Sequence, residues 1–135
     1  MHMNKSRNRV AVKIGAAVAT VLIMTSIASA QNLFGSIYFS QATGAHGYSL
    51  DYDTQYQAEQ RALNECLGAG GTDCVRATWF RNACGALAVG DGRGWGSHWG
   101  NNRRGAEINA LNTCDRNTSG CRIVRWVCTR NAVNR

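Results

Sequence analysis

The chain of 135 residues has no proline, and its two lysines both lie within the first 13 residues. A collagen-like chain requires abundant proline, and a Walker-type phosphate loop requires a lysine that residues 31–135 lack, so both are excluded. The patterns Cys-x-x-Cys and Gly-x-Ser-x-Gly are also missing, which disfavours zinc sites, thioredoxin-like redox sites and a serine nucleophile. The content of 44% hydrophobic and 17% charged residues excludes a disordered chain and a multi-pass membrane protein.

The first 30 residues have the layout of a cleaved signal peptide. Cationic residues up to Lys13 precede an apolar stretch over residues 14–27, and residues 28–30 read Ala-Ser-Ala, a small-x-small cleavage site. The apolar stretch is short for a permanent membrane anchor, which is the alternative interpretation. We therefore expect residues 31–135 to form a single domain that is periplasmic or secreted by a bacterial cell. No stable membrane anchor is expected after cleavage.

The expected mature chain is only mildly basic. Residues 31–135 hold 11 arginines and 8 acidic residues, a net charge of +3. Because the acidic residues are interspersed among the arginines, the sequence does not predict the clustered basic face that nucleic-acid binding requires. We expect no nucleic acid as a partner.

Two copies of one pattern divide the expected mature chain into repeats of about residues 35–82 and 83–130. Residues 58–66 and 106–114 both read Ala-Glu-x-x-Ala-Leu-x-x-Cys, at an offset of 48. Downstream, residues 74–79 and 121–126 both read Cys-x-x-x-x-Trp, at an offset of 47. Upstream, residues 47–49 are matched with residues 94–96. Since neither unit could bury its apolar side alone, we expect the two copies to pack face to face.

All six cysteines lie in the repeats, and an even number in a small exported domain predicts disulfides rather than metal or redox chemistry. Composition leaves 15 pairings open, but the repeat favours one. In each copy one cysteine ends a helix and the next opens a strand, and the remaining two are expected to join the copies. The predicted bridges are Cys66–Cys74, Cys114–Cys121 and Cys84–Cys128.

The local patterns predict an α+β fold. Alanine-rich periodicity indicates helices over residues 54–66 and 103–114, capped at Thr54 and Asn102. β-branched and aromatic residues indicate strands over residues 36–40, 75–81, 84–89 and 122–128, with hairpin returns at 48–50 and 94–96. We expect a tandem ββαβ repeat that forms a mostly antiparallel sheet with both helices on one face. A ferredoxin-like βαββαβ order is the alternative.

The same residues resemble domain-of-unknown-function family 4189, a family of small exported bacterial domains. The resemblance covers roughly residues 36–128. It rests on the export signal, the Gly-Tyr-Ser turn at 47–49, the helix motif at 58–66, the strand from Asp73 to Trp79, and the segment Arg-Asn-Ala-Cys-Gly-Ala-Leu-Ala at 81–88. It implies an envelope or secreted location and agrees with a disulfide framework. It brings no activity and no catalytic residue.

The segment 90–104 is the main candidate for binding, because two tryptophans on a glycine-rich loop offer ring faces while asparagine and arginine supply hydrogen bonds. The alternative is a hairpin whose tryptophans pack onto the domain, with glycines needed for positive φ. The two other tryptophans, Trp79 and Trp126, are expected in the core. The predicted binding residues are Arg93, Trp95, His98, Trp99, Asn101, Arg103 and Arg104.

Titratable residues give weaker hypotheses. His46 and His98 are placed at equivalent turns, where Asp51, Asp53 or Asp91 could complete a metal or acid–base site, although solvated turn histidines are the simpler interpretation. Glu59 and Glu107 occupy matching helix positions, where a negative charge offsets the helix dipole more simply than it serves a glycosidase. No metal, cofactor or catalytic set is therefore assigned.

These patterns predict a small, disulfide-stabilised binding module that recognises a protein partner or an envelope glycan, in the manner of an inhibitor or immunity protein. Two alternatives stay open. One is an envelope-directed hydrolase that uses His98 with Asp91 or Glu107, and the other is a structural component without a dedicated site. The sequence leaves the oligomeric state undetermined.

Overall fold

A computed structural model describes residues 11–23 and 30–135 of the chain. Residues 11–23 contain no helix or strand, and no helix in the described ranges has the length and apolar character to cross a membrane. Most of the expected cationic region and Ala28-Ser29 of the expected cleavage site lie outside the described residues. The helices and strands are β1 (Phe34–Phe39), β2 (His46–Tyr52), α1 (Gln55–Gly68), β3 (Val75–Arg81), β4 (Cys84–Val89), the 3-10 helix η1 (Asp91–Arg93), β5 (Trp95–Gly100), α2 (Arg103–Asp115) and β6 (Arg122–Cys128).

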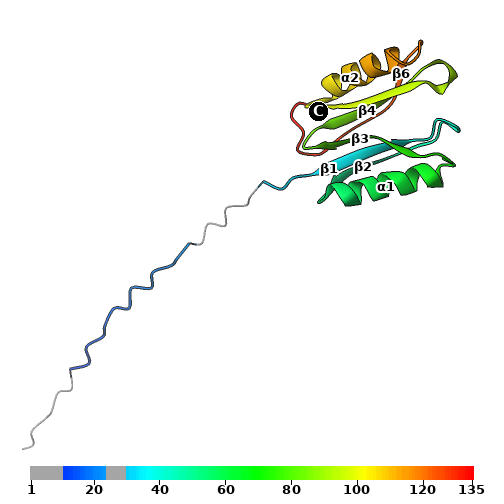
Figure 1. Ribbon diagram of the computed structural model, residues 1–135. Helices are drawn as coiled ribbons and strands as arrows, with labels where there is room; N and C mark the ends of the chain where they lie inside the picture. The colour runs from blue at the N-terminus through cyan, green and yellow to red at the C-terminus, as the bar shows by residue number, and fades with distance from the viewer. Residues whose placement is uncertain (1–10, 24–29) are drawn as a thin grey trace, which may run out of the picture.

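The strands form two antiparallel three-stranded sheets, one from each repeat. The first has the order β2-β1-β3 and the second β5-β4-β6, so the first strand of each repeat is central. The sheets stack with β3 over β5 and β2 over β6, and the helices lie on the two outer sides (Figure 1). The predicted α+β class, the tandem ββαβ repeat and the antiparallel pairing are confirmed.

The arrangement differs from the prediction in one respect: α1 and α2 cover opposite outer faces of two stacked sheets instead of sharing one face of a single sheet. The reason is visible in β4, whose alternate residues point to opposite sides. Ala86 and Ala88 pack under α2, whereas Leu87 packs toward the first sheet. Each central strand is therefore buried on both sides, and its two sides require two different covering layers.

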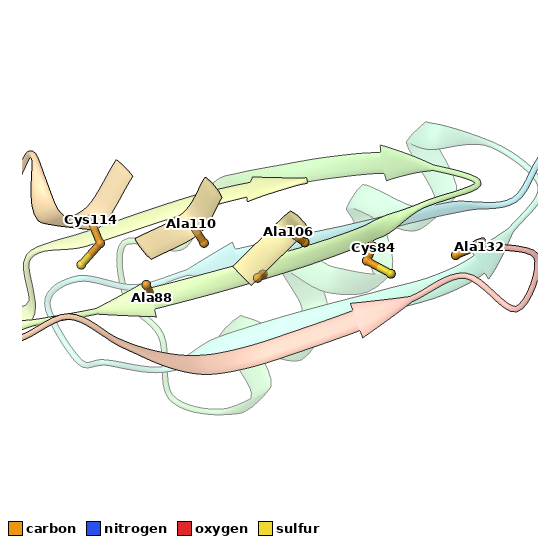
Figure 2. Packing of buried hydrophobic residues seen from close by; sticks show 7 residues of the cluster. Cys84, Ala88, Ala106, Ala110, Cys114 and Ala132 are labelled. Carbon is orange, nitrogen blue, oxygen red and sulfur yellow. The ribbon is translucent and has the colours of Figure 1, made fainter. Parts of the chain in front are cut away.

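Both helices begin where the sequence places them, because a side-chain cap supplies an acceptor for a free backbone amide. The Thr54 hydroxyl accepts from the amide of Gln57 at 3.2 Å, and the Asn102 side chain accepts from the amide of Gly105 at 2.8 Å. The buried face of each helix consists of two alanines and a cysteine. In the second repeat these residues, Ala106, Ala110 and Cys114, face β4 across a thin apolar layer (Figure 2).

Such small residues allow a close approach of helix and sheet, and two glycines complete it. A Cβ atom on Gly47 of β2 would lie 2.3 Å from the carbonyl oxygen of Ala62 in α1. A Cβ atom on Gly96 of β5 would lie 2.2 Å from the amide nitrogen of Cys114 in α2. Gly47 and Gly96 are thus the structurally equivalent pair, and the predicted match of Gly47 with Gly94 is two residues out of register.

The larger apolar core lies between the two sheets. Ile37 and Phe39 of β1, Phe80 of β3, Leu87 of β4 and Val127 of β6 are all at least 93% buried there. Burial of side chains of this size stabilises a fold by about 1.5–3 kcal/mol each. The association of the two repeats therefore depends mainly on apolar packing between their sheets.

The three predicted disulfides are present, and all six cysteines of the chain are bonded. Cys66–Cys74 and Cys114–Cys121 each connect a helix to the following strand. Cys84–Cys128, expected to join the two repeats, instead joins paired residues of β4 and β6 within the second sheet. Disulfides persist in oxidising environments, so the framework is consistent with an extracellular or periplasmic protein.

Candidate functional site

The principal surface depression lies between the two sheets, along the edge where β3 and β5 are the terminal strands. It is lined by Arg76–Arg81 of β3 and Ser97–Trp99 of β5 and has a volume of about 510 Å³. A second hollow of about 430 Å³ shares Ala77 and Ser97 with the first and extends past Trp95 to the end of α2. We refer to the first depression, Arg76–Arg81 with Ser97–Trp99, as the β3–β5 groove.

Two exposed tryptophans and three basic side chains characterise the β3–β5 groove. Trp99 is 48% exposed and stacks against His98 with 6.2 Å between ring centroids. The Nδ1 atom of His98 lies 2.8 Å from the carbonyl oxygen of Trp99, so it carries the proton, since a carbonyl can only accept. Trp79 is 37% exposed and stacks on Phe34. Among the residues that the structure describes, no aspartate or glutamate lines the groove.

Two of the predicted binding residues serve instead to connect the repeats. Arg93 donates from Nε to the carbonyl oxygen of Gln41 at 2.6 Å and from Nη2 to that of Ala42 at 2.7 Å. It therefore connects the β4–β5 loop of the second repeat to the β1–β2 loop of the first. Trp95 is half-buried and packs edge-to-face on Phe39, with 5.6 Å between centroids. For Trp95 the structure therefore favours the alternative, a hairpin whose tryptophans pack onto the domain.

The three predicted residues at the start of α2 lie apart from this contact. Arg103 places its guanidinium 3.9 Å from the centroid of Trp126 and donates from Nε to Glu107 at 2.7 Å. Asn101 and Arg104 are exposed beside it. The predicted binding set is therefore divided among the β3–β5 groove (His98 and Trp99), the contact between repeats (Arg93 and Trp95) and the N-terminus of α2.

The prediction that Trp79 and Trp126 belong to the core is wrong, since they are 37% and 39% exposed. Both stand on the outer face of a terminal strand, beyond the width that one alanine-rich helix covers. Phe34 covers one side of Trp79, and the Arg103 guanidinium covers one side of Trp126. Their equivalence in the repeat was correctly predicted, because they pair with Ser36 and Ala86 at corresponding places of the central strands.

The two histidines are not equivalent and do not come together. His46 begins β2 and pairs with Phe39, so its equivalent in the second sheet is Trp95. His98 lies inside β5 and pairs with Ala86. They lie on opposite edges of the molecule, because His46 contacts Arg125 of β6 through Nε2 at 3.4 Å. Burial, followed by the positive charge of Arg125, lowers the pKa of His46 below its ordinary value of 6.5, so the neutral form is favoured.

The carboxylates considered for catalysis are held in structural contacts. Glu59 pairs with Arg76 at 2.8 Å and Glu107 with Arg103 at 2.7 Å, so both support the helices on which they lie. Glu107 pairs with Arg103, which lies over Trp126 of β6, so Glu107 is on the β6 side of α2. Asn109 is on the β5 side of the helix, where it donates to the carbonyl oxygen of Trp99. His98 and Glu107 therefore lie on different sides of the helix.

Asp91 lies at the other end of β5 from His98, beside Gly120. The described residues hold no group of three or more His, Cys, Asp or Glu side chains that could bind a metal ion. The geometry thus assembles no acid–base pair around His98 from the residues that the sequence suggested.

Over residues 34–128 the sequence matches the family described as Domain of unknown function (DUF4189). The chain belongs to this family. Proteins Rv1269c of Mycobacterium tuberculosis and Mb1300c of Mycobacterium bovis are each 41% identical to it over 64 residues, or 47% of this chain and 48% of theirs. The chain therefore spans about half the length of the curated relatives it matches.

A solved structure extends this likeness to three dimensions. The NMR structure of Rv1813c from Mycobacterium tuberculosis has 33% sequence identity to this chain and superposes with a TM-score of 0.53. The match covers 76% of this chain and 78% of that one. The resemblance found from the helix and strand motifs is confirmed by the family match over residues 34–128.

The sequence pointed to only one side of the β3–β5 groove. It singled out His98 and Trp99 but not the β3 residues opposite them, such as Thr78 and Arg81. The available signal was weak: exposed basic residues flank Trp79 in a strand, which is typical of a terminal strand. Which two terminal strands face each other depends on how the sheets stack, and no local pattern specifies that.

Proposed function

We propose that this DUF4189 protein is an exported, disulfide-stabilised binding module that recognises a protein partner through the β3–β5 groove. The observation that carries the proposal is the juxtaposition of two terminal strands, with Trp99 of β5 exposed on the side that faces the first sheet and Trp79 exposed on the outer face of β3. Aromatic side chains that are partly exposed in a concave surface are typical of interaction sites. The bridges Cys66–Cys74 and Cys114–Cys121 each hold a helix against the sheet that presents one of these strands.

Export is part of the proposal. The basic and apolar opening with Ala28-Ser29-Ala30 supports a signal peptide cleaved after Ala30, and three disulfides in so small a domain support an oxidising destination. A bacterial periplasm or the cell exterior satisfies both. In such a compartment a rigid domain is suited to binding another envelope or secreted protein, including as an inhibitor or immunity protein.

A protein partner fits the groove better than an envelope glycan does. A sugar stacks on an open aromatic face, and Phe34 already covers one face of Trp79 and His98 one face of Trp99. The groove also runs along the unpaired edge of β3, and the edge of a terminal strand is recognised by the backbone of another polypeptide. The hydrolase alternative gains no supporting contact, since His98 donates to a backbone carbonyl and not to a carboxylate.

Site-specific photo-crosslinking tests the proposal. We would replace Trp99 with a photoreactive phenylalanine analogue in the full-length protein, export it in its native host, irradiate intact cells and identify the adducts by mass spectrometry. Trp126 provides a matched control, since it is another tryptophan of similar exposure, on the terminal strand of the opposite edge. We expect a defined protein adduct from position 99 and none of that mass from position 126.

A quantitative comparison completes the test. With the cross-linked protein purified, Trp99→Ala should weaken binding at least tenfold, and Trp126→Ala should change it less than twofold. An aromatic residue at the centre of an interface contributes about 2 kcal/mol or more, or about thirtyfold in affinity, so a tenfold loss is the lower bound. Equal adducts from both positions, equal effects of both substitutions, or binding to envelope glycans without any protein adduct would refute the proposal.

A further inference from the structure

The two strands that line the β3–β5 groove differ in how their outer edges are satisfied. On β5, the side chain of Asn117 donates to the carbonyl oxygen of Trp95 at 2.8 Å and that of Asn109 to the carbonyl oxygen of Trp99 at 3.0 Å. Asn109 of α2 and Asn117 of the turn after it thus occupy two carbonyl groups that a further strand would need. The β5 edge is therefore partly closed by its own repeat.

The β3 edge is open. β3 ends its sheet, and in the described part of the chain no strand pairs with its outer side. Helix α1 lies mainly over β2 and β1 and, within the described residues, gives β3 no side-chain cap comparable to Asn109 and Asn117 on β5. Unpaired amides and carbonyls on a terminal strand can accept an additional strand.

Resting on the proposed function, we infer that the groove takes an extended acidic segment of the partner protein, which adds to the first sheet as a strand alongside β3. The segment from Arg76 to Arg81 spans about 17 Å at the usual rise per residue, enough for five or six residues of an extended chain. The bulge at Ala77, where the β1–β3 register shifts, leaves Thr78–Arg81 as the regular part of the edge.

The side chains around this edge specify the chemistry of the segment. Alternation along the strand places Trp79 and Arg81 on the outer face, and Thr78 and Phe80 toward the second sheet. A paired segment would therefore present one row of side chains to Trp79 and Arg81, and the other row to Trp99 across the groove. Apolar residues suit the two tryptophans.

The charge of the groove selects acidic residues. Arg76 and Arg81 line it, and among the described residues no carboxylate does. Arg76 is already paired with Glu59, whereas no ion pair involves Arg81 in the described part of the chain. A carboxylate on the segment near Arg81 would find an unpaired cation, and a lysine or arginine there would be repelled.

Peptide selection tests the inference directly. The exported, disulfide-bonded protein would be used to select from a phage library of random eight-residue peptides, and the enriched peptides would be resynthesised for calorimetry. We expect enrichment in aspartate or glutamate alternating with apolar residues. Methylation of every second backbone nitrogen in the selected peptide should abolish binding, because it removes the amide protons that pair with β3.

Charge variants supply the matched comparison. Arg81→Glu should weaken peptide binding about tenfold and Arg81→Gln about threefold. Arg122→Glu, at an exposed arginine on β6, the terminal strand of the opposite edge, should change it less than twofold. Circular dichroism establishes that each variant is folded. Hydrogen exchange with the peptide bound should show new protection at outward amides of Val75–Arg81 and none along β6.

Several results would overturn the inference: enrichment of basic or neutral peptides, no enrichment at all, undiminished binding of the methylated peptide, or equal effects of Arg81→Glu and Arg122→Glu. These outcomes are separable from failure of the proposed function. A protein adduct at Trp99 together with any of them would keep the binding module and remove the added strand. The absence of an adduct at Trp99 would remove the binding module itself.

Discussion

The close approach of helix and sheet in the second repeat makes Gly96→Ala the sharpest stability prediction. The added Cβ atom would lie 2.2 Å from the amide nitrogen of Cys114 and 2.6 Å from the carbonyl carbon of Thr113. To reach ordinary contact distance, α2 would have to move outward by about 1 Å. It cannot move freely, because Cys114 is tied to Cys121 and its alanines pack directly on β4.

Overpacking of a tight core costs about 1–3 kcal/mol, and a clash with helix backbone cannot be relieved by a rotamer change. We expect Gly96→Ala to lower the free energy of unfolding by about 2–3 kcal/mol, which corresponds to a fall in Tm of about 10–20 °C in a domain of this size. Gly47→Ala should cost a similar amount in the first repeat, where the clash is with the Ala62 carbonyl.

The assay is urea or guanidinium unfolding with the disulfides intact, followed by tryptophan fluorescence and far-ultraviolet circular dichroism. Gly68→Ala is the control: Gly68 ends α1, its φ is not positive, and a Cβ atom there would meet nothing within 4 Å. That substitution should stabilise the protein by up to about 1 kcal/mol through helix propensity. If Gly96→Ala unfolds within about 0.5 kcal/mol of the wild type, the reasoning from close approach is wrong.

Three further predictions concern the bridges, pH and export. Replacing both cysteines of the Cys84–Cys128 bridge by alanine should cost about 4 kcal/mol, against about 2.5 kcal/mol for the Cys114–Cys121 bridge, because the sequence separations are 44 and 7; guanidinium unfolding of both variants measures the difference. The lowered pKa of His46 means that its contribution to stability is complete above pH 6.5 and is lost as the pH falls below that value; urea midpoints between pH 5 and 8 should rise with pH, and His46→Gln should flatten the rise. Intact-mass analysis of exported protein should give a chain that begins at Gln31 and carries no titratable thiol, whereas a retained leader would contradict the predicted cleavage site.

Local patterns in the sequence were sufficient to predict the helices, the strands and the three disulfides. The capping residues Thr54 and Asn102 and the alanine spacing located both helices, since these signals act within one turn of chain. The repeat of Cys66 at Cys114 selected the three bridges, because the same local unit requires the same short helix-to-strand link twice. The family resemblance arose from the same local motifs.

Local patterns could not place residues whose surroundings come from another layer. Alternation shows that Trp95 and Trp79 lie on particular faces of their strands. It does not show that Trp95 packs on Phe39 of the other repeat, or that Trp79 stays 37% exposed beside Phe34. The match of Gly47 with Gly94 was also wrong, because it assumed an offset of 47 between the copies. The offset is 49 at the equivalent pair Gly47 and Gly96, although it is 47 at Trp79 and Trp126. Bulges in β2 and β3 shift the pairing without leaving a mark in composition.

The sequence by itself therefore determined the repeat, the helices, the strands and the cysteine pairing, because each depends on residues near in the chain or on the equivalence of the two copies. Only the tertiary structure decided that the sheets stack with β3 over β5, which puts Arg81 and Trp99 on one groove and His46 on the opposite edge. The physical reason is that apolar faces make two sheets stack but do not specify which edges face each other. That choice depends on how the side chains of both sheets fit together.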